Sequence, residues 1–261
     1  MSGVLDLSWW QLGFALVLVA VVVAISLRQR LGLERDLAIG SVRTIGQLYL
    51  VGLILAAVFS AARWYWVLLI LVVMAAIATH AAVSRLGKPI PGVYWIAATA
   101  LTISTAATLA WVIGIVVQPR PWWEPQYLIP IAGMILGNSM TSAALAGDRL
   151  QADLFARRDE VEARLALGFS GREAVQPLVR AALRAAMIPT VNGMMTVGLV
   201  QLPGMMTGQI LAGASPLTAI RYQIVVVFML AVATAVGSLL FVRLAVGRYL
   251  TPAHQLRRYL L

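Results

Sequence analysis

Long apolar stretches alternate with short polar segments along this chain. About 20 apolar residues in a helix cross the hydrocarbon core of a bilayer. The pattern therefore predicts an all-α, polytopic integral membrane protein with about seven transmembrane helices. They are predicted near residues 9–27, 37–59, 64–83, 93–117, 127–147, 186–212 and 217–242. Tryptophan and tyrosine residues stand at the start of several stretches, which is typical of membrane interfaces.

Composition and charge favour the same class of protein. The 261 residues are 61% apolar and 11% charged, whereas about a quarter of the residues of a soluble domain are charged. Of the 20 basic residues, 16 lie in the polar segments on one side of the predicted membrane and only two on the opposite side. Positive residues favour the cytosolic side, so we expect the N-terminus outside and the C-terminus in the cytosol. This placement accounts for the net charge of +10, and no nucleic-acid partner is expected.

The segment 189–216 is apolar but unlike a simple spanning helix. It holds no charge, yet it contains three prolines, five glycines and four methionines. Interrupted helices are tolerated in a membrane where other helices or a cavity satisfy the backbone. We therefore predict that this segment is a gate in a transport pathway, hinged near Pro189 or near Pro203 and Gly204. Its predicted pathway residues are Asn192, Met195, Met205, Met206 and Gln209.

Polar residues occur in two other predicted spans. Arg43 and Gln47 are four residues apart and share one helix face, which suits a pathway or an inter-helix pair. The alternative is that Arg43 extends to the cytosolic interface. Asn138 follows a GxxxG pair, Gly133 and Gly137, that favours close helix packing or a dimer seam. Asn138 and Asn192 are predicted either to line a pathway or to form inter-helical hydrogen bonds. The methionines are predicted as pathway walls or as packing in an irregular helix.

Several absences narrow the chemistry. The sequence contains no cysteine, and none of the predicted spans contains Asp or Glu. A proton-coupled transporter usually needs a carboxylate within the membrane, so a secondary transporter is disfavoured. His80 is predicted to be a structural or interfacial histidine rather than a metal ligand, and no metal ligand is assigned. No phosphate loop of the GxxxxGK[ST] type is present. The chain is therefore not expected to be an enzyme or to hold a cofactor, and any ATP must be hydrolysed by a partner.

The segment 148–184 is the longest polar part of the chain. Arginines alternate with acidic residues, while apolar residues recur at helical spacing, which predicts amphipathic helices on the cytosolic side. Glu162 and Ala163 are followed five residues later by Gly168, a spacing that resembles the loop by which permeases of ATP-binding-cassette (ABC) importers hold their ATPase. We predict a coupling segment with Glu162, Ala163 and Gly168 at its centre. The alternative is a solvated connector.

Three stretches of sequence resemble one known family. These are GLVQLPGMMTGQILAGASP from Gly198, IAGMILGNSMTSAAL from Ile131 and RTIGQLYLVG from Arg43. They are similar to the FetB family of iron-export permeases, whose plant relatives are associated with aluminium tolerance. The resemblance covers about residues 11–248.

Membership of that family would make residues 1–261 a single permease domain of an ABC exporter in the cell membrane. The resemblance implies a homodimer of this permease with cytosolic ABC ATPase subunits, exporting iron or another metal-related solute. The alternatives are a secondary transporter or channel that acts alone, and a membrane scaffold.

Overall fold

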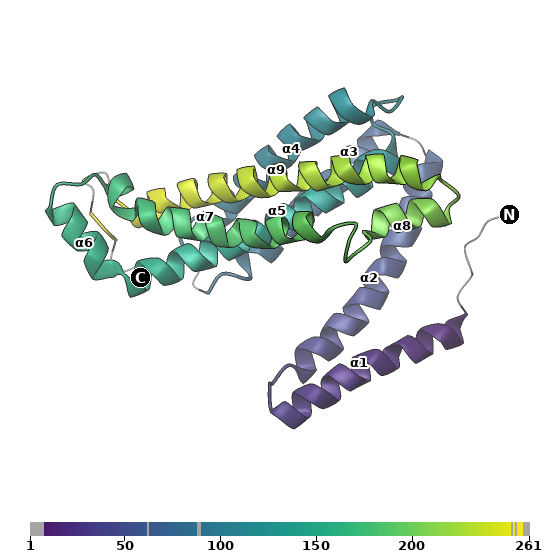
Figure 1. Cartoon of the computed structure of the whole chain (residues 1–261), viewed down its shortest axis with the longest axis horizontal. Coiled ribbons are helices and arrows are strands. Elements are labelled where there is room, and N and C mark those ends of the chain that lie inside the picture. Colours follow the sequence, from purple (N-terminus) through teal and green to yellow (C-terminus); the bar gives the residue numbers. More distant parts are fainter. Residues whose placement is uncertain (1–7, 62, 88–89, 252, 254, 258–261) are drawn as a thin grey trace. The chain divides into compact units, whose positions relative to one another are not determined.

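The computed structural model describes residues 8–61, 63–87, 90–251, 253 and 255–257 (Figure 1). The elements named in these residues are all helical. In chain order they are α1 (Trp9–Gln29), α2 (Glu34–Ala61), α3 (Trp64–Val83), α4 (Val93–Trp111), the π-helical turn η1 (Val112–Val117), α5 (Pro125–Ala156), α6 (Arg158–Ala166), α7 (Gly171–Thr196), α8 (Gly204–Leu211) and α9 (Pro216–Tyr249). The chain divides into two units, Met1–Arg63 with Leu211–Gly213, and Trp64–Ile210 with Ala214–Leu261.

The first unit contains α1 and α2, two apolar helices joined by a short turn. The turn uses left-handed backbone at Arg30 and Gly32. The buried Ser26 fixes it, because its hydroxyl donates to Glu34 Oε1 at 2.9 Å and accepts from Leu33 N at 3.2 Å. Most other side chains of the two helices are exposed, as expected of helices that face lipid.

The second unit is organised around α5. This helix contacts α3, α4, α7 and α9, and in Figure 1 α5, α7 and α9 run side by side. Sixteen of its residues are buried, many of them Ala, Ser or Gly. Small residues let helices approach closely in a membrane, where apolar burial alone does not favour association. The core of this unit therefore depends on close packing of the helix backbones against one another.

The closest approach is at Gly147 of α5. A Cβ atom there would lie 2.6 Å from Phe241 Cε1 of α9 and 2.8 Å from Leu86 Cδ2. The approach at Gly237 of α9 is less tight, because a Cβ atom there would lie 3.3 Å from Ser139 Cβ of α5. By contrast, Gly137 has nothing of the described chain within 4 Å, and Gly133 meets only Met74. The two glycines of the predicted GxxxG pair therefore do not both pack closely against another helix of the described chain. A role for them in a dimer interface stays a prediction.

Within the described part of the chain, six helices are long and apolar enough to cross a membrane: α1, α2, α3, α4 with η1, α5 and α9. They confirm six of the predicted spans. The span predicted at 186–212 is not one helix, because α7 ends at Thr196 and α8 begins at Gly204. The polar N-terminal half of α7 also belongs to the segment predicted to be cytosolic. A seventh crossing, and the orientation of the termini, stay predictions.

The segment 148–184 is helical and amphipathic, as predicted. It comprises the end of α5, all of α6 and the first half of α7. Its six regularly spaced apolar residues belong to the core of the second unit, five of them buried and Leu165 packed against them: Leu150, Leu154, Val161, Leu165, Val175 and Leu178. The segment is therefore packed as part of the core and is not a loop that projects from it.

Gly147→Ala should lower the free energy of unfolding by about 1–3 kcal/mol, the usual cost of overpacking a core. The new methyl group would push against the buried Phe241 ring, and the gain in helix propensity of about 1 kcal/mol offsets only part of this. Gly137→Ala, ten residues earlier in α5, is the matched control and should be neutral or slightly stabilising. Thermal unfolding in nanodiscs measures both. Equal stability of the two variants would contradict the packing described.

Candidate transport cavity and cytosolic element

The backbone leaves helical geometry between α7 and α8. Residues 197–203 turn with Gly198 at φ 83°, a value that favours glycine. The turn satisfies part of its own backbone, because Gly198 N donates to Gln201 O at 3.0 Å and Val200 N to Thr196 O at 2.9 Å. Pro203 precedes α8, which suits a residue without an N–H at the start of a helix. The interruption predicted within 189–216 is confirmed, and it lies beside Pro203; Pro189 is inside α7.

A cavity of about 350 Å³ lies against this broken segment. Its walls come from the end of α7, the turn, α8 and the first turns of α9. Most of the lining is apolar, and the exceptions are the thioethers of Met194 and Met206 and the amide of Gln223. Such a site offers weak, neutral ligands and no formal charge.

Gln223 is the most unusual of the cavity's side chains. The residue is 8% exposed, and its Oε1 is buried without a hydrogen-bond partner among the described residues. An unpaired buried acceptor costs about 1–3 kcal/mol. In native proteins such groups are few, and each needs a reason. Gln223 therefore points to a place where a bound molecule would complete the bonding.

Sequence reasoning found part of this cavity. Pro203 and Met206 line it. Gly204, Met205 and Gln209 lie on α8 beside them, and Gln209 Oε1 is also buried without a partner among the described residues. Gln223 was missed, although its position two residues after Arg221 in an apolar span was a visible signal.

The remaining predicted pathway residues do not line the cavity. Asn192 and the 73% exposed Met195 lie near the end of α7. Asn138 donates from Nδ2 to Met134 O at 3.0 Å within its own helix, which is the contact recorded for its amide among the described residues. Arg43 and Gln47 are exposed on α2 in the first unit. Their roles in a pathway stay predictions.

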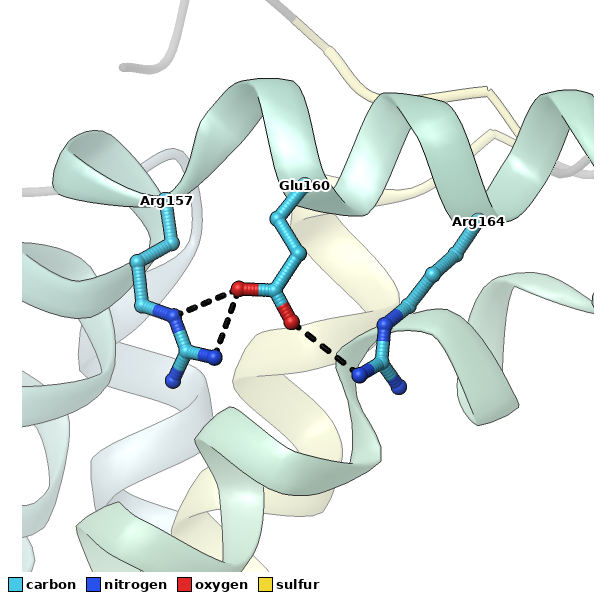
Figure 2. Close-up of polar contacts among 3 residues, drawn as sticks. All are labelled: Arg157, Glu160 and Arg164. Atoms are coloured by element: carbon cyan, nitrogen blue, oxygen red, sulfur yellow. Dashed lines mark hydrogen bonds and ion pairs between the residues drawn. The ribbon is translucent and has the colours of Figure 1, made fainter.

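The segment predicted to be cytosolic contains ion pairs along α6 (Figure 2). Arg157 Nη2 lies 2.6 Å from Glu160 Oε2, and Arg164 Nη2 lies 3.0 Å from Glu160 Oε1. The hydrogen bond from Arg157 and the two positive charges lower the pKa of Glu160 from its ordinary value. Glu162 is paired with Arg158 at 3.0 Å. Two of these pairs, Glu160 with Arg164 and Arg158 with Glu162, have i,i+4 spacing. Pairs at this spacing each support a helix by a few tenths of a kcal/mol.

The turn after α6 carries the three-residue segment Leu167–Phe169. Gly168 has φ 90°, and Gly168 N and Phe169 N donate to Leu165 O and Arg164 O, as in a glycine-ended helix. Leu167 is 78% exposed and Phe169 is 48% exposed. Ser170 then caps α7 by a reciprocal pair of hydrogen bonds with Glu173. Two large apolar side chains are thus held in solvent by a well-formed turn, an arrangement typical of a docking surface.

Metal-binding chemistry is sparse in the described residues. They contain no group of three or more His, Cys, Asp and Glu side chains that could hold a metal ion. His80 stacks on Tyr94, and His80 Nδ1 lies 3.4 Å from Tyr94 Oη, which fits the structural role predicted for it.

The fold and the cavity together define a polytopic, all-helical membrane protein. Comparison with known proteins places the chain in the uncharacterised protein family UPF0014, whose family model matches residues 9–250. No solved structure is significantly similar to it.

Three relatives are similar over nearly the whole chain. A UPF0014 membrane protein of Synechocystis, slr1647, is 40% identical over 97% of this chain and 98% of its own length. The probable iron export permease protein FetB of Escherichia coli K12 is 36% identical over 94% and 93%. The protein ALUMINUM SENSITIVE 3 of Arabidopsis thaliana is 35% identical over 94% and 88%. The chain is thus a multi-pass membrane protein of the family that the sequence motifs indicated.

Replacement of Gln223 by Met keeps the length of the side chain and removes the unpaired amide. We expect Gln223→Met to raise the free energy of unfolding by about 1 kcal/mol, because the unpaired acceptor is destabilising. Met229→Leu, a buried change of similar volume six residues further along α9, should give no gain. Thermal unfolding of the two variants measures the difference. A clear loss of stability in Gln223→Met would show that the amide is already paired.

Proposed function

We propose that this chain is the membrane-spanning permease subunit of an ABC-type exporter. Two copies would combine with two cytosolic ATPase subunits, which bind and hydrolyse the ATP. The cargo is iron or another metal ion, or a metal-related solute, moved out of the cytosol. The name of the Escherichia coli relative, probable iron export permease protein FetB, supports this cargo.

One structural observation carries the proposal: an unbroken helical connection leads from the Leu167–Phe169 surface to the cavity. α7 has 26 residues and is therefore about 39 Å long at 1.5 Å per residue. It begins directly after Phe169 and ends at the turn that lines the cavity. On the other side of the surface, α6 leads into α5, whose 32 residues extend about 48 Å, well beyond the roughly 30 Å hydrocarbon core.

This connection supports alternating access as the mechanism. Closure of an ATPase dimer would displace Leu167–Phe169, and α7, which stays helical through Pro177 and Pro189, would carry the displacement towards the cavity. The turn at 197–203 has a few separate backbone hydrogen bonds instead of the continuous series of a helix, so it would resist such a movement less than α7 or α9. In hinge movements, a few residues take up most of the change in backbone angles. In this proposal α8 and the turn form the gate, with Pro203 and Gly204 at its hinge.

The chemistry of the cavity supports a weakly held cargo. Thioethers prefer soft metal ions, and amide oxygens prefer hard ones, so Met194, Met206 and Gln223 favour neither strongly. The described lining contains no carboxylate that would trap a bare cation. A transient metal site or an uncharged metal complex therefore fits the cavity better than a tightly coordinated ion.

Leu167→Asp combined with Phe169→Asp should weaken binding of the cognate ATPase by at least about 30-fold, the effect of losing about 2 kcal/mol at an interface hot spot. The matched control is Leu167→Met with Phe169→Leu, which keeps the surface apolar and should retain binding. Because both side chains are exposed, neither variant should change the melting temperature.

Pull-down of the ATPase, permease-stimulated ATP hydrolysis and metal efflux from proteoliposomes are the measurements. Loss of all three in the Asp variant alone is the expected result. Full ATPase binding by the Asp variant would contradict the assigned surface. Efflux driven by an ion gradient without any ATPase would contradict the proposed function itself.

A further inference from the structure

A second hollow lies between α7 and α9, far along both helices from the cavity at the turn. It has a volume of about 650 Å³. Three arginines line it, Arg172 and Arg180 from α7 and Arg243 from α9. Between them the lining is apolar and includes Leu183 and Leu239. We call this hollow the arginine groove.

The arginines of this groove lack partners, unlike those of the neighbouring segment. Arg149, Arg157, Arg158 and Arg164 each pair with a carboxylate. Among the described residues, no ion pair joins Arg172, Arg180 or Arg243 to an acid. The carboxylate in the lining is that of Glu173, and its Oε2 already accepts from Ser170 N at 2.9 Å and from Ser170 Oγ at 2.7 Å. The groove therefore carries excess positive charge.

The position of the groove along α9 places it at the edge of the membrane. α9 carries no charged residue between Arg221 and Arg243. Leu239 lies 18 residues after Arg221 and Arg243 lies 22 residues after it, so they are about 27 Å and 33 Å along the helix from Arg221. The hydrocarbon core is about 30 Å thick. α7 runs in the opposite direction (Figure 1), so its Leu183 is the deeper residue and Arg172 the more superficial one. The apolar end of the groove is thus at the depth of acyl chains, and its charged end is at the depth of headgroups.

We propose that the arginine groove binds an anionic phospholipid of the cytosolic leaflet. The phosphate would lie between Arg180 and Arg243, and an acyl chain would lie along Leu183 and Leu239. A guanidinium group can donate two parallel hydrogen bonds to two oxygens of one phosphate. Basic pockets between membrane helices on the cytosolic side are known to bind anionic lipid headgroups. A free phosphate ion would use the arginines alone and leave the apolar part of the groove unfilled.

The bound lipid would join α7 to α9 at their cytosolic ends. α7 is the helix that runs from the Leu167–Phe169 surface to the cavity. A lipid held by both helices would restrain α7 against α9 and favour the arrangement seen in this structure. The site does not depend on the identity of the cargo or of the ATPase.

The test uses the purified full chain in detergent, titrated with phosphatidylglycerol, with phosphatidylcholine and with inorganic phosphate. Phosphatidylglycerol should raise the melting temperature in a saturable way, and bound lipid should be detected by native mass spectrometry. Phosphatidylcholine at the same concentrations should give little shift. An equal shift with inorganic phosphate would overturn the assignment to a lipid.

The variant Arg180→Gln with Arg243→Gln should weaken phosphatidylglycerol binding at least tenfold. Arg184→Gln, one turn further along α7 and outside the lining, is the matched control and should bind within twofold of the wild type. Arg180→Lys with Arg243→Lys keeps the charge and should restore most of the binding, which also shows that the effect is not misfolding. Unchanged binding in the double Gln variant would overturn the proposal.

Discussion

Backbone amides and carbonyls within a bilayer must find partners inside the protein, and this constraint shapes the molecule more than any other. Most of the chain meets it by forming helices. The turn at 197–203, within the span predicted at 186–212, is not helical. There Gly198 N and Val200 N are satisfied by nearby carbonyls, and the apolar side chains of Leu199 and Val200 face outwards. An irregular segment of this kind is stable in a membrane only beside protein or a cavity. Here it borders the cavity that contains the unpaired amide of Gln223.

The continuous core of the second unit connects its apolar helices to the segment 148–184, because Leu154, Val161 and Val175 are buried in the same cluster as the membrane part of α5. The ion pairs of Glu160 with Arg157 and Arg164 support α6. In the proposed mechanism, a force on Leu167–Phe169 would reach the apolar helices through α5 and α7. The arginine groove lies between α7 and α9, along the half of α7 that follows Leu167–Phe169, so a bound lipid would act on the same connection.

Hydrophobic patterning predicted six spans and the amphipathic faces of the cytosolic segment, because both depend on local spacing in the sequence. It could not place the helix break, since the prolines at 189 and 203 carry the same local signal and only packing decides that α7 continues through Pro189. Gly147 was missed because its importance comes from Phe241, 94 residues away. Leu167 and Phe169 were missed for a related reason. An apolar residue in a cytosolic segment is expected to be buried, and the structure alone shows that these two are not.

In the proposed mechanism, α7 transmits the conformational changes of a partner ATPase to the cavity. Because the chain contains no cysteine, a single Met206→Cys variant places one reactive thiol in the cavity wall. The measurement is the rate at which a water-soluble thiol reagent modifies this residue in the reconstituted complex, with and without a non-hydrolysable ATP analogue. The account predicts a several-fold change of rate with the analogue that disappears when Leu167 and Phe169 are replaced by Asp. An unchanged rate in a complex that still hydrolyses ATP and exports its cargo would contradict it.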